Sequence, residues 1–401
     1  MKLNYAGNAY KHRFVTAVLP KMFRDEQALK GILEFITRDG LRMVQTGVTD
    51  KSGNRFYAAC INVVGDWAWL AKCGNLARSY HNIEKRPRGA NANPRGICHL
   101  CCAGKLPYPF EDLRLHSVPA WRRTRFSEDA FTTPPALARL PHVPGQTAGL
   151  FAFDLWHAYH LGVAKSFLAG CLALLSDAML DGRGAIDARF SQISDMYLAY
   201  CEASGSLPYL TTISKDTIGW PDRGTYPNGM WSKGHVSTSI SNFFQDFCSK
   251  HDVAGMNNGD YLVLCGECNG WMNSCMDSLY RSDVWLLAND AKQIAMNALR
   301  FLDGYMRLAR KAYDDGKHLF PFMPKAHALH EVFYTLHDEA TSGVAYALNP
   351  LIRAVQVDED YIGKTSRLAR RTGAPQVVTR VLQRGLQASF AHWYEAGYIR
   401  S

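Results

Sequence analysis

The sequence predicts an α/β fold with a predominantly helical body, and two observations lead to this prediction. Apolar residues recur at helical spacing over most of the 401 residues, whereas only Phe56–Val64 clearly combines a continuous apolar run with β-branched residues. A composition of 47% hydrophobic and 20% charged residues is typical of folded proteins and excludes wholesale disorder. No apolar run reaches the roughly 20 residues of a membrane helix, so we expect no membrane partner.

The predicted elements follow in chain order. A helix at Met22–Asp39 ends at the breaker pair Asp39-Gly40, and the strand Phe56–Val64 is expected to be buried and central. A helix then begins at Trp67, so that Asp66 closes the strand, where open α/β sheets place their chemistry. Further helices are expected at Phe153–Leu180, Ile186–Ala203, Ser239–His251, Trp271–Tyr313, Lys325–His337 and Glu359–Ala391, with a short strand at Tyr261–Cys265.

The net charge of +9 is concentrated in two stretches. Residues 84–125 contain nine Lys or Arg against three acids, and residues 353–384 contain seven against three. Clustered positive charge favours a polyanionic partner such as nucleic acid, although a solvated basic surface gives the same pattern. The candidate phosphate contacts are Arg122, Arg123, Lys364, Arg367, Arg370 and Arg371.

The cysteines point to a metal site. The N-terminus lacks the apolar core of a signal peptide, which predicts a reducing, intracellular compartment for the eleven cysteines. There, the spacing of Cys98-His-Leu-Cys101 suits two ligand positions of a tetrahedral zinc ion, with plain burial of the two thiols as the alternative. The remaining ligands are expected from one of two segments: His327 with His330, or Cys265 and Cys268 with Cys275 nearby.

Two groups of ionisable residues are candidates for catalysis. Asp154 and His157 lie three residues apart on a predicted helix, so that carboxylate and imidazole face the same way. A helix cap at Asp154 with a buried His157 is the alternative. In Asp358-Glu359-Asp360, one carboxylate could bind a divalent metal beside the arginines that follow, or all three could form a solvated charge cluster.

Four segments occur in an order that resembles DDE-type DNA transposases of the CACTA and Plavaka-like group. They are GDWAWLAKCGNLARSYHN followed by CHLC, then DLWHAYHLGVAK, then HALHE reached through FPFMPK, and finally EDYIGKTSRLARR. The resemblance covers roughly residues 20–390. Each motif is short, so their shared order carries the resemblance.

The resemblance implies a ribonuclease-H-like core interrupted by a large helical insertion. The implied parts are a partial core at 1–83, a Cys- and Arg-rich loop with the zinc site at 84–150, the insertion at 151–320 and a C-terminal part at 321–401 that returns to the core. The implied catalytic residues are Asp66 as second aspartate, Glu359 as glutamate, and Asp154 with His157 as the pair between them. The implied ligands of a structural zinc are Cys98, Cys101, His327 and His330.

The implied chemistry is the cleavage and transfer of DNA strands by two carboxylate-bound Mg²⁺ ions. The first catalytic aspartate has no counterpart, because Asp25, Asp39 and Asp50 lie too close to Asp66. We therefore expect an N-terminally truncated chain, derived from a mobile element and inactive alone, with DNA as partner, a nuclear location and a homo-oligomer left open. The alternatives are a non-catalytic, zinc-stabilised nucleic-acid-binding module and an unrelated helical protein.

Overall fold

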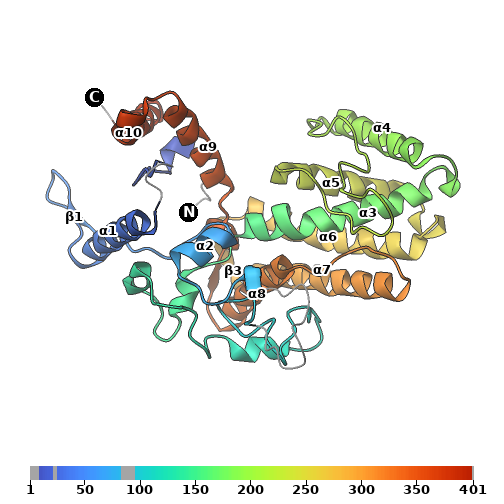
Figure 1. The fold of residues 1–401 in the computed structure, drawn as a ribbon, viewed down its shortest axis with the longest axis horizontal. Coiled ribbons are helices and arrows are strands. Elements are labelled where there is room, and N and C mark those ends of the chain that lie inside the picture. Colours follow the sequence, from blue (N-terminus) through green and yellow to red (C-terminus); the bar gives the residue numbers. More distant parts are fainter. Residues whose placement is uncertain (1–8, 21–24, 83–94, 400–401) are drawn as a thin grey trace. The chain divides into compact units, whose positions relative to one another are not determined.

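The computed structural model describes residues 9–20, 25–82 and 95–399, and the chain forms two compact units (Figure 1). Unit 1 contains residues 80–125 and 155–351, whereas unit 2 combines the described residues of 2–79, 126–154 and 352–401. Both units are built mainly from helices. The units therefore cut across the four parts that the resemblance implies, since unit 2 joins both ends of the chain with a segment from its middle.

Unit 1 is a bundle of long helices. They are α3 (Ala164–Ala178), α4 (Ile186–Ser204), α5 (Gly234–Lys250), α6 (Gly259–Arg281), α7 (Ala288–Asp314) and α8 (Pro324–Thr341). The main contacts join α5 to α6, α6 to α7 and α7 to α8, and Figure 1 shows α3, α6 and α7 running side by side. Twelve of the fifteen residues of α3 are buried, because this helix is apolar on almost every side. Helix α3 is thus the centre of the bundle.

A π-helical segment, η7 (Trp156–Val163), leads into α3 and is broken at Gly162, whose backbone is not helical. A side chain at Gly162 would collide with Lys325, whose ammonium group donates to the Leu161 carbonyl at 3.0 Å. The combined span Trp156–Ala178 is long and apolar enough to cross a membrane, but 78% of its most apolar window is buried. This burial makes it the core helix of unit 1.

Unit 2 combines α1 (Glu26–Gln45), α2 (Trp67–Cys73), α9 (Gln356–Arg370) and α10 (Val377–Glu395). Helix α1 packs on the short helix η5 (Ala136–Arg139), and α9 and α10 pack on each other and on η1 (Ala9–Lys11). The buried core side chains are Leu70, Cys73, Leu137, Leu140, Leu150 and Phe151. The other short helices, from both units, are η3 (Tyr80–Asn82), η4 (Ala120–Thr124), η6 (Thr147–Leu150), η8 (Met179–Gly182), η9 (Val253–Gly255), η10 (Pro350–Arg353) and η11 (Ala374–Gln376).

The described residues form two sheets, each of two antiparallel strands. In unit 2, β1 (Val48–Thr49) pairs with β2 (Arg55–Phe56); in unit 1, β3 (Trp285–Leu287) pairs with β4 (Tyr346–Leu348). One isolated parallel bridge joins Val63 to Phe151 in unit 2. The predominantly helical body is therefore confirmed, whereas the ribonuclease-H-like core stays a prediction.

The prediction of a buried central strand at Phe56–Val64 is wrong. Only Arg55 and Phe56 belong to a strand, and the side chains of Phe56 and Ile61 are 58% and 68% exposed. Residues 57–64 form no sheet, and their one strand-like contact is the isolated bridge at Val63. The segment is apolar, as a buried strand would be, but among the described residues it has no neighbouring strands to bury its side chains.

Two further predictions need correction. The expected strand Tyr261–Cys265 lies inside α6, because the buried Tyr261, Cys265 and Cys268 recur at i, i+4 and i+7, the period of a helix. The expected helix Trp271–Tyr313 is divided by β3, and Glu359–Ala391 is divided at η11. A third correction concerns the helix Met22–Asp39: its first residues lie outside the described part of the chain, and the helix does not end at Asp39-Gly40 but continues through Gly40 to Gln45. The remaining predicted helices are confirmed within a few residues, most closely α4, which ends where Gly205 adopts φ 65°.

Candidate metal centre

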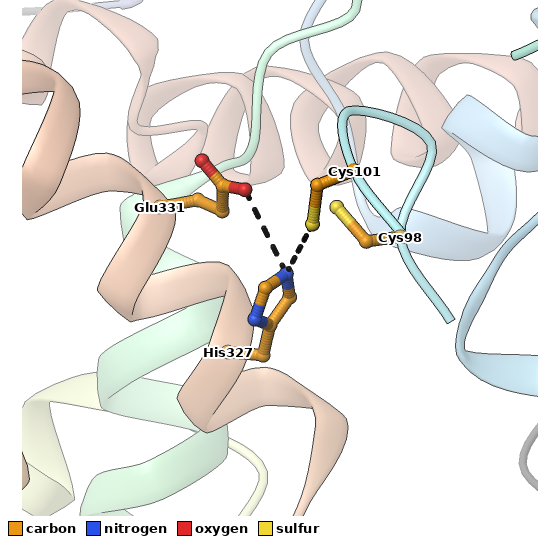
Figure 2. A group of neighbouring side chains, drawn as sticks. All are labelled: Cys98, Cys101, His327 and Glu331. Carbon is orange, nitrogen blue, oxygen red and sulfur yellow. Dashed lines mark hydrogen bonds and ion pairs between the residues drawn. The ribbon is translucent and has the colours of Figure 1, made fainter. Parts of the chain in front are cut away.

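Four buried side chains of unit 1 converge on one point from two distant segments. Cys98 and Cys101 come from the loop before η4, and His327 and Glu331 come from α8 (Figure 2). One donor atom from each residue lies within 4.8 Å of all the others. Two thiols, an imidazole and a carboxylate make a set of four donors that could hold a metal ion.

The loop is shaped by its own backbone. The Ile97 N–H donates to the Ala103 carbonyl at 2.8 Å, which closes a turn around the two thiols, and the Leu100 N–H points at Cys98 Sγ from 3.3 Å. Gly104 continues the turn at φ 80°, where a side chain would also press on Ile97 at 3.0 Å. The glycine is therefore needed for the loop to fold back on itself.

Helix α8 presents the other two donors. His327 and Glu331 are one turn apart on the same face, and Nε2 of His327 lies 3.4 Å from Cys101 Sγ and 3.8 Å from a carboxylate oxygen of Glu331. The indole of Trp121 packs edge-on against the His327 ring, with centroids 4.4 Å apart. The wall of the site is thus aromatic, and the imidazole has little freedom to turn.

The four donors lie close together and are shielded from water, and both conditions shift their pKa values. Burial alone would raise the pKa of the Cys98 thiol, but the hydrogen bond from Cys101 and the charge of His327 outweigh it, and the pKa lies well below its usual value. Burial and then the neighbouring Cys98 raise the pKa of Cys101. Burial and then the charge of Cys98 also raise the pKa of Glu331. Binding of a cation here would favour the deprotonated thiols and carboxylate and would release their protons.

One arginine, Arg125, contacts the carboxylate of the site, and a second, Arg122, contacts the following turns of α8. Arg125 Nε lies 3.2 Å from Glu331 Oε2, and its guanidinium also donates to Thr335 at 3.2 Å. Neither carboxylate oxygen of Glu331 accepts a hydrogen bond of ordinary geometry, although the side chain is only 1% exposed. Arg122 forms an ion pair with Asp338 and lies 3.8 Å above the Tyr334 ring. A buried carboxylate that faces two thiols and an imidazole and is paired with a single guanidinium is a candidate metal ligand.

Glu331 takes the place that the sequence assigned to His330. The His330 ring instead stacks on Tyr334 at 4.5 Å and is outside the group of four donors. Burial, followed by the charge of His327, lowers its pKa well below the usual value, so it is a neutral packing residue. The signal for Glu331 was present in HALHE, because a residue at i+4 from His327 shares its face as well as one at i+3.

The second cysteine pair is not a metal site in this structure. Cys265, Cys268 and Cys275 are fully buried in α6, and among the described residues no group of three potential ligands contains them. A side chain at Gly304 would collide with Cys268 Sγ, so this thiol fills the close contact between α6 and α7. These cysteines act as small core residues.

The predicted catalytic residues lie in both units. In unit 2, Asp66 accepts a hydrogen bond from the Trp69 N–H at 2.6 Å and caps α2, while the buried Asp154 accepts from the Val355 N–H at 3.1 Å. Glu359 is in the first turn of α9. His157 is half-buried in the π-helical segment of unit 1. Among the described residues, no group of potential metal ligands contains Asp66, Asp154 or Glu359.

The candidate phosphate contacts differ in accessibility. Arg367, Arg370 and Arg371 are exposed on α9, whereas Lys364 pairs with Asp360 at 2.7 Å. Asp358, another of the three acids of this segment, pairs with Arg13 at 2.6 Å. In unit 1, Arg123 is exposed, and Arg122 is occupied by Asp338 and Tyr334 as described above. The arginines of α9 are therefore the most available.

Comparisons of the chain with protein-family models, with curated proteins and with solved structures find no match. The metal centre is accordingly interpreted from its own geometry.

Proposed function

We propose that this chain is a transposase-derived protein that binds DNA and does not cleave it alone, and that its metal centre holds a structural Zn²⁺. The observation that carries the DNA-binding proposal is the α9–α10 segment. From Tyr361 to Tyr394 the sequence contains six Lys or Arg and no acidic residue. Five of the six are exposed: Arg367, Arg370, Arg371, Arg380 and Arg384.

Zinc is the metal that best suits the donors. Thiolates disfavour the hard ions Mg²⁺ and Ca²⁺, whereas zinc binds cysteine sulfur, histidine nitrogen and carboxylate oxygen and is usually tetrahedral. All four donors are buried, which leaves no open position for a substrate or a reactive water. The ion would therefore join the loop to α8 and stabilise unit 1.

The transposase origin is supported by the parallel bridge in unit 2. The Val63 N–H donates to Leu150 and the Ala152 N–H donates to Val63, so the two segments run in the same direction. Asp66 and Asp154 each follow the bridge by three residues and lie at the same level of the pair. Asp154 also anchors the residue before α9, the helix that carries Glu359. This arrangement is what a remnant of a ribonuclease-H-like core would retain.

The same contacts argue against cleavage by the chain alone. The Asp66 carboxylate is engaged as a helix cap, and that of Asp154 is buried on a backbone N–H. A two-metal site needs several carboxylates whose oxygens converge on ions roughly 4 Å apart. The described residues bring no such group together.

DNA binding can be tested by fluorescence anisotropy on a labelled duplex over a range of salt concentrations. The Arg367→Ala/Arg370→Ala/Arg371→Ala variant should bind more weakly. The negative slope of log affinity against log salt should become shallower by about 2 to 3. The matched control removes three exposed basic residues elsewhere in unit 2: Arg38→Ala, Lys51→Ala and Arg55→Ala. Equal losses in both variants would show that the segment has no special role.

Cleavage can be tested by nicking of supercoiled plasmid in the presence of Mg²⁺. We expect no activity above background from the wild-type chain. Activity that disappears in both Asp66→Asn and Glu359→Gln would overturn this part of the proposal and restore the catalytic assignment.

A further inference from the structure

Arg125 joins the two segments that form the candidate metal centre. It follows η4 directly, in the stretch of chain that also contains Cys98 and Cys101, and its guanidinium reaches α8. There its Nε lies 3.2 Å from Oε2 of Glu331, and a terminal nitrogen donates to the Thr335 hydroxyl at 3.2 Å. Glu331 and Thr335 are about one helical turn apart, so the two contacts together fix the guanidinium on α8.

The two carboxylate oxygens of Glu331 face different partners. Oε2 lies against Arg125, whereas Oε1 lies 3.8 Å from Nε2 of His327. Figure 2 shows one carboxylate oxygen directed toward the imidazole and the other directed away from it. The side chain is almost completely buried, so bulk water does not compete for either oxygen. Arg125 therefore holds one oxygen and leaves the other to face the remaining donors.

The charge of the metal-loaded site explains why a guanidinium is needed there. Two thiolates, one carboxylate and a neutral imidazole carry three negative charges, and a divalent ion offsets two of them. One negative charge then remains in a buried site, where an unpaired charge is costly. Arg125 supplies a positive charge beside Glu331, the ligand that introduces the excess. With the neutral His330 as ligand in its place, the loaded site would need no such partner.

We propose that Arg125 is a positioning residue of the candidate metal centre, which presents one oxygen of Glu331 to the ion and offsets the residual negative charge. This inference rests on the structural Zn²⁺ proposed above. Removal of a group that holds a metal ligand in place typically weakens metal binding by about 10–100-fold. We therefore expect Arg125 to control zinc affinity through Glu331.

Arg122 provides a matched comparison. It lies in η4 and also contacts α8, but its partners are Asp338 and the Tyr334 ring. Neither partner belongs to the group of four donors. A variant at Arg122 therefore removes an arginine contact between the same two segments without touching a ligand.

The test measures the zinc affinity of the full chain by competition with a chromophoric chelator. Arg125→Gln should weaken zinc binding by about 10–100-fold, and Arg125→Lys, which keeps the charge, should recover part of this loss. Arg122→Gln should bind zinc as tightly as the wild type. In the Glu331→Gln background, Arg125→Gln should have little further effect, because the two side chains act as one unit.

A spectroscopic measurement separates positioning from a general loss of structure. Co²⁺ can replace zinc, and its visible d–d bands report the ligands that surround it. Arg125→Gln should keep the thiolate-to-cobalt charge-transfer band of the two cysteines and shift the d–d bands toward those of Glu331→Gln. A variant that only loosened unit 1 would weaken both features together.

The outcomes separate this inference from the zinc proposal. If the wild type binds no zinc, the structural-zinc proposal fails and the inference fails with it. If the wild type binds zinc and Arg125→Gln binds it equally well, the inference alone is overturned. It is also overturned if Arg125→Gln causes the same loss in the wild-type and Glu331→Gln backgrounds, or if Arg122→Gln causes an equal loss, because the effect would then not act through the carboxylate.

Discussion

Helix α3 of unit 1 and helix α1 of unit 2 have similar lengths but opposite environments. Twelve of fifteen residues are buried in α3, whereas in α1 only Thr37 is buried and Phe35 is 54% exposed. Helix α1 has a clear amphipathic pattern, with apolar residues at Leu29, Leu33 and Ile36. The comparison teaches that the pattern specifies the helix, while its burial depends on what the rest of the fold supplies.

The contrast extends through both units. Unit 1 contains the long buried helices and the candidate metal centre, whereas in unit 2 helix α9 buries Tyr361 alone and α10 buries only Val381, Gly385 and Ser389. We expect the two units to unfold with different free energies, because the stability of a region follows the apolar surface that it buries. The following experiments test this difference.

The largest effect is expected at the metal centre. Cys98→Ser or Glu331→Gln should lower the zinc content and reduce the unfolding free energy of unit 1 by several kcal/mol, because metal binding contributes directly to folding. Hydrogen exchange of α8 should accelerate, and exchange in unit 2 should not. Metal analysis after dialysis, with hydrogen exchange read by mass spectrometry, measures both.

Two controls accompany this experiment. Cys102→Ser changes the neighbouring buried thiol, and His330→Gln changes the histidine outside the donor group. Both should retain the metal. If His330→Gln loses zinc and Glu331→Gln keeps it, the ligand set expected from the sequence is correct and the one described here is not.

A smaller effect is expected from matched truncations of two phenylalanines. Phe167 in α3 is 1% exposed, so Phe167→Ala should cost about 3–5 kcal/mol, whereas Phe35→Ala in α1 should stay within about 0.5 kcal/mol. Urea unfolding measures both values. Similar losses would mean that α1 is covered in solution, and the comparison between the units would fail.

The effect that is smallest near neutral pH concerns the buried His160 of unit 1. Burial lowers its pKa to about 3, so protonation favours the unfolded chain, in which a histidine titrates near 6.5. The free energy of unfolding is therefore unaffected by His160 above pH about 6.5. Between that pH and about pH 3 the unfolded chain takes up the proton, and the free energy of unfolding falls by at most about 1.4 kcal/mol per pH unit. Urea unfolding at several pH values should show a shallower decline for His160→Gln.

The control for this experiment is His116→Gln, at an exposed position of unit 1. It removes a histidine without removing a buried one. An identical pH dependence for wild type and His160→Gln would mean that the imidazole at 160 is not held neutral.

The sequence predicted the helices of unit 1 well and both strand candidates poorly. Periodicity and the left-handed Gly205 place α4 almost to the residue, because these signals are local. The run at Phe56–Val64 could not be judged locally, since burial of a strand depends on neighbours that the sequence does not specify. Similarly, Tyr261–Cys265 is short enough to fit either period.

The candidate metal site was predicted in part. The spacing of Cys98 and Cys101 identified the thiols, but spacing cannot show which residues of distant segments lie close together. His327 was predicted only as part of one of two alternative segments, and through the family resemblance. The preference of Glu331 over His330 depends on the direction from which the loop approaches α8. That direction is a property of the tertiary structure alone.

The separation of the metal donors along the chain has a consequence for biosynthesis. Cys101 and His327 are 226 residues apart, so at ribosomal rates of 5–20 residues per second the two thiols wait about 10 to 45 s for α8 to be made. During this interval the Cys98–Cys101 pair has no histidine or carboxylate from α8 to share a metal with. The nascent thiols must therefore stay reduced until α8 emerges, and the four candidate donors first come together as a late step in the synthesis of unit 1.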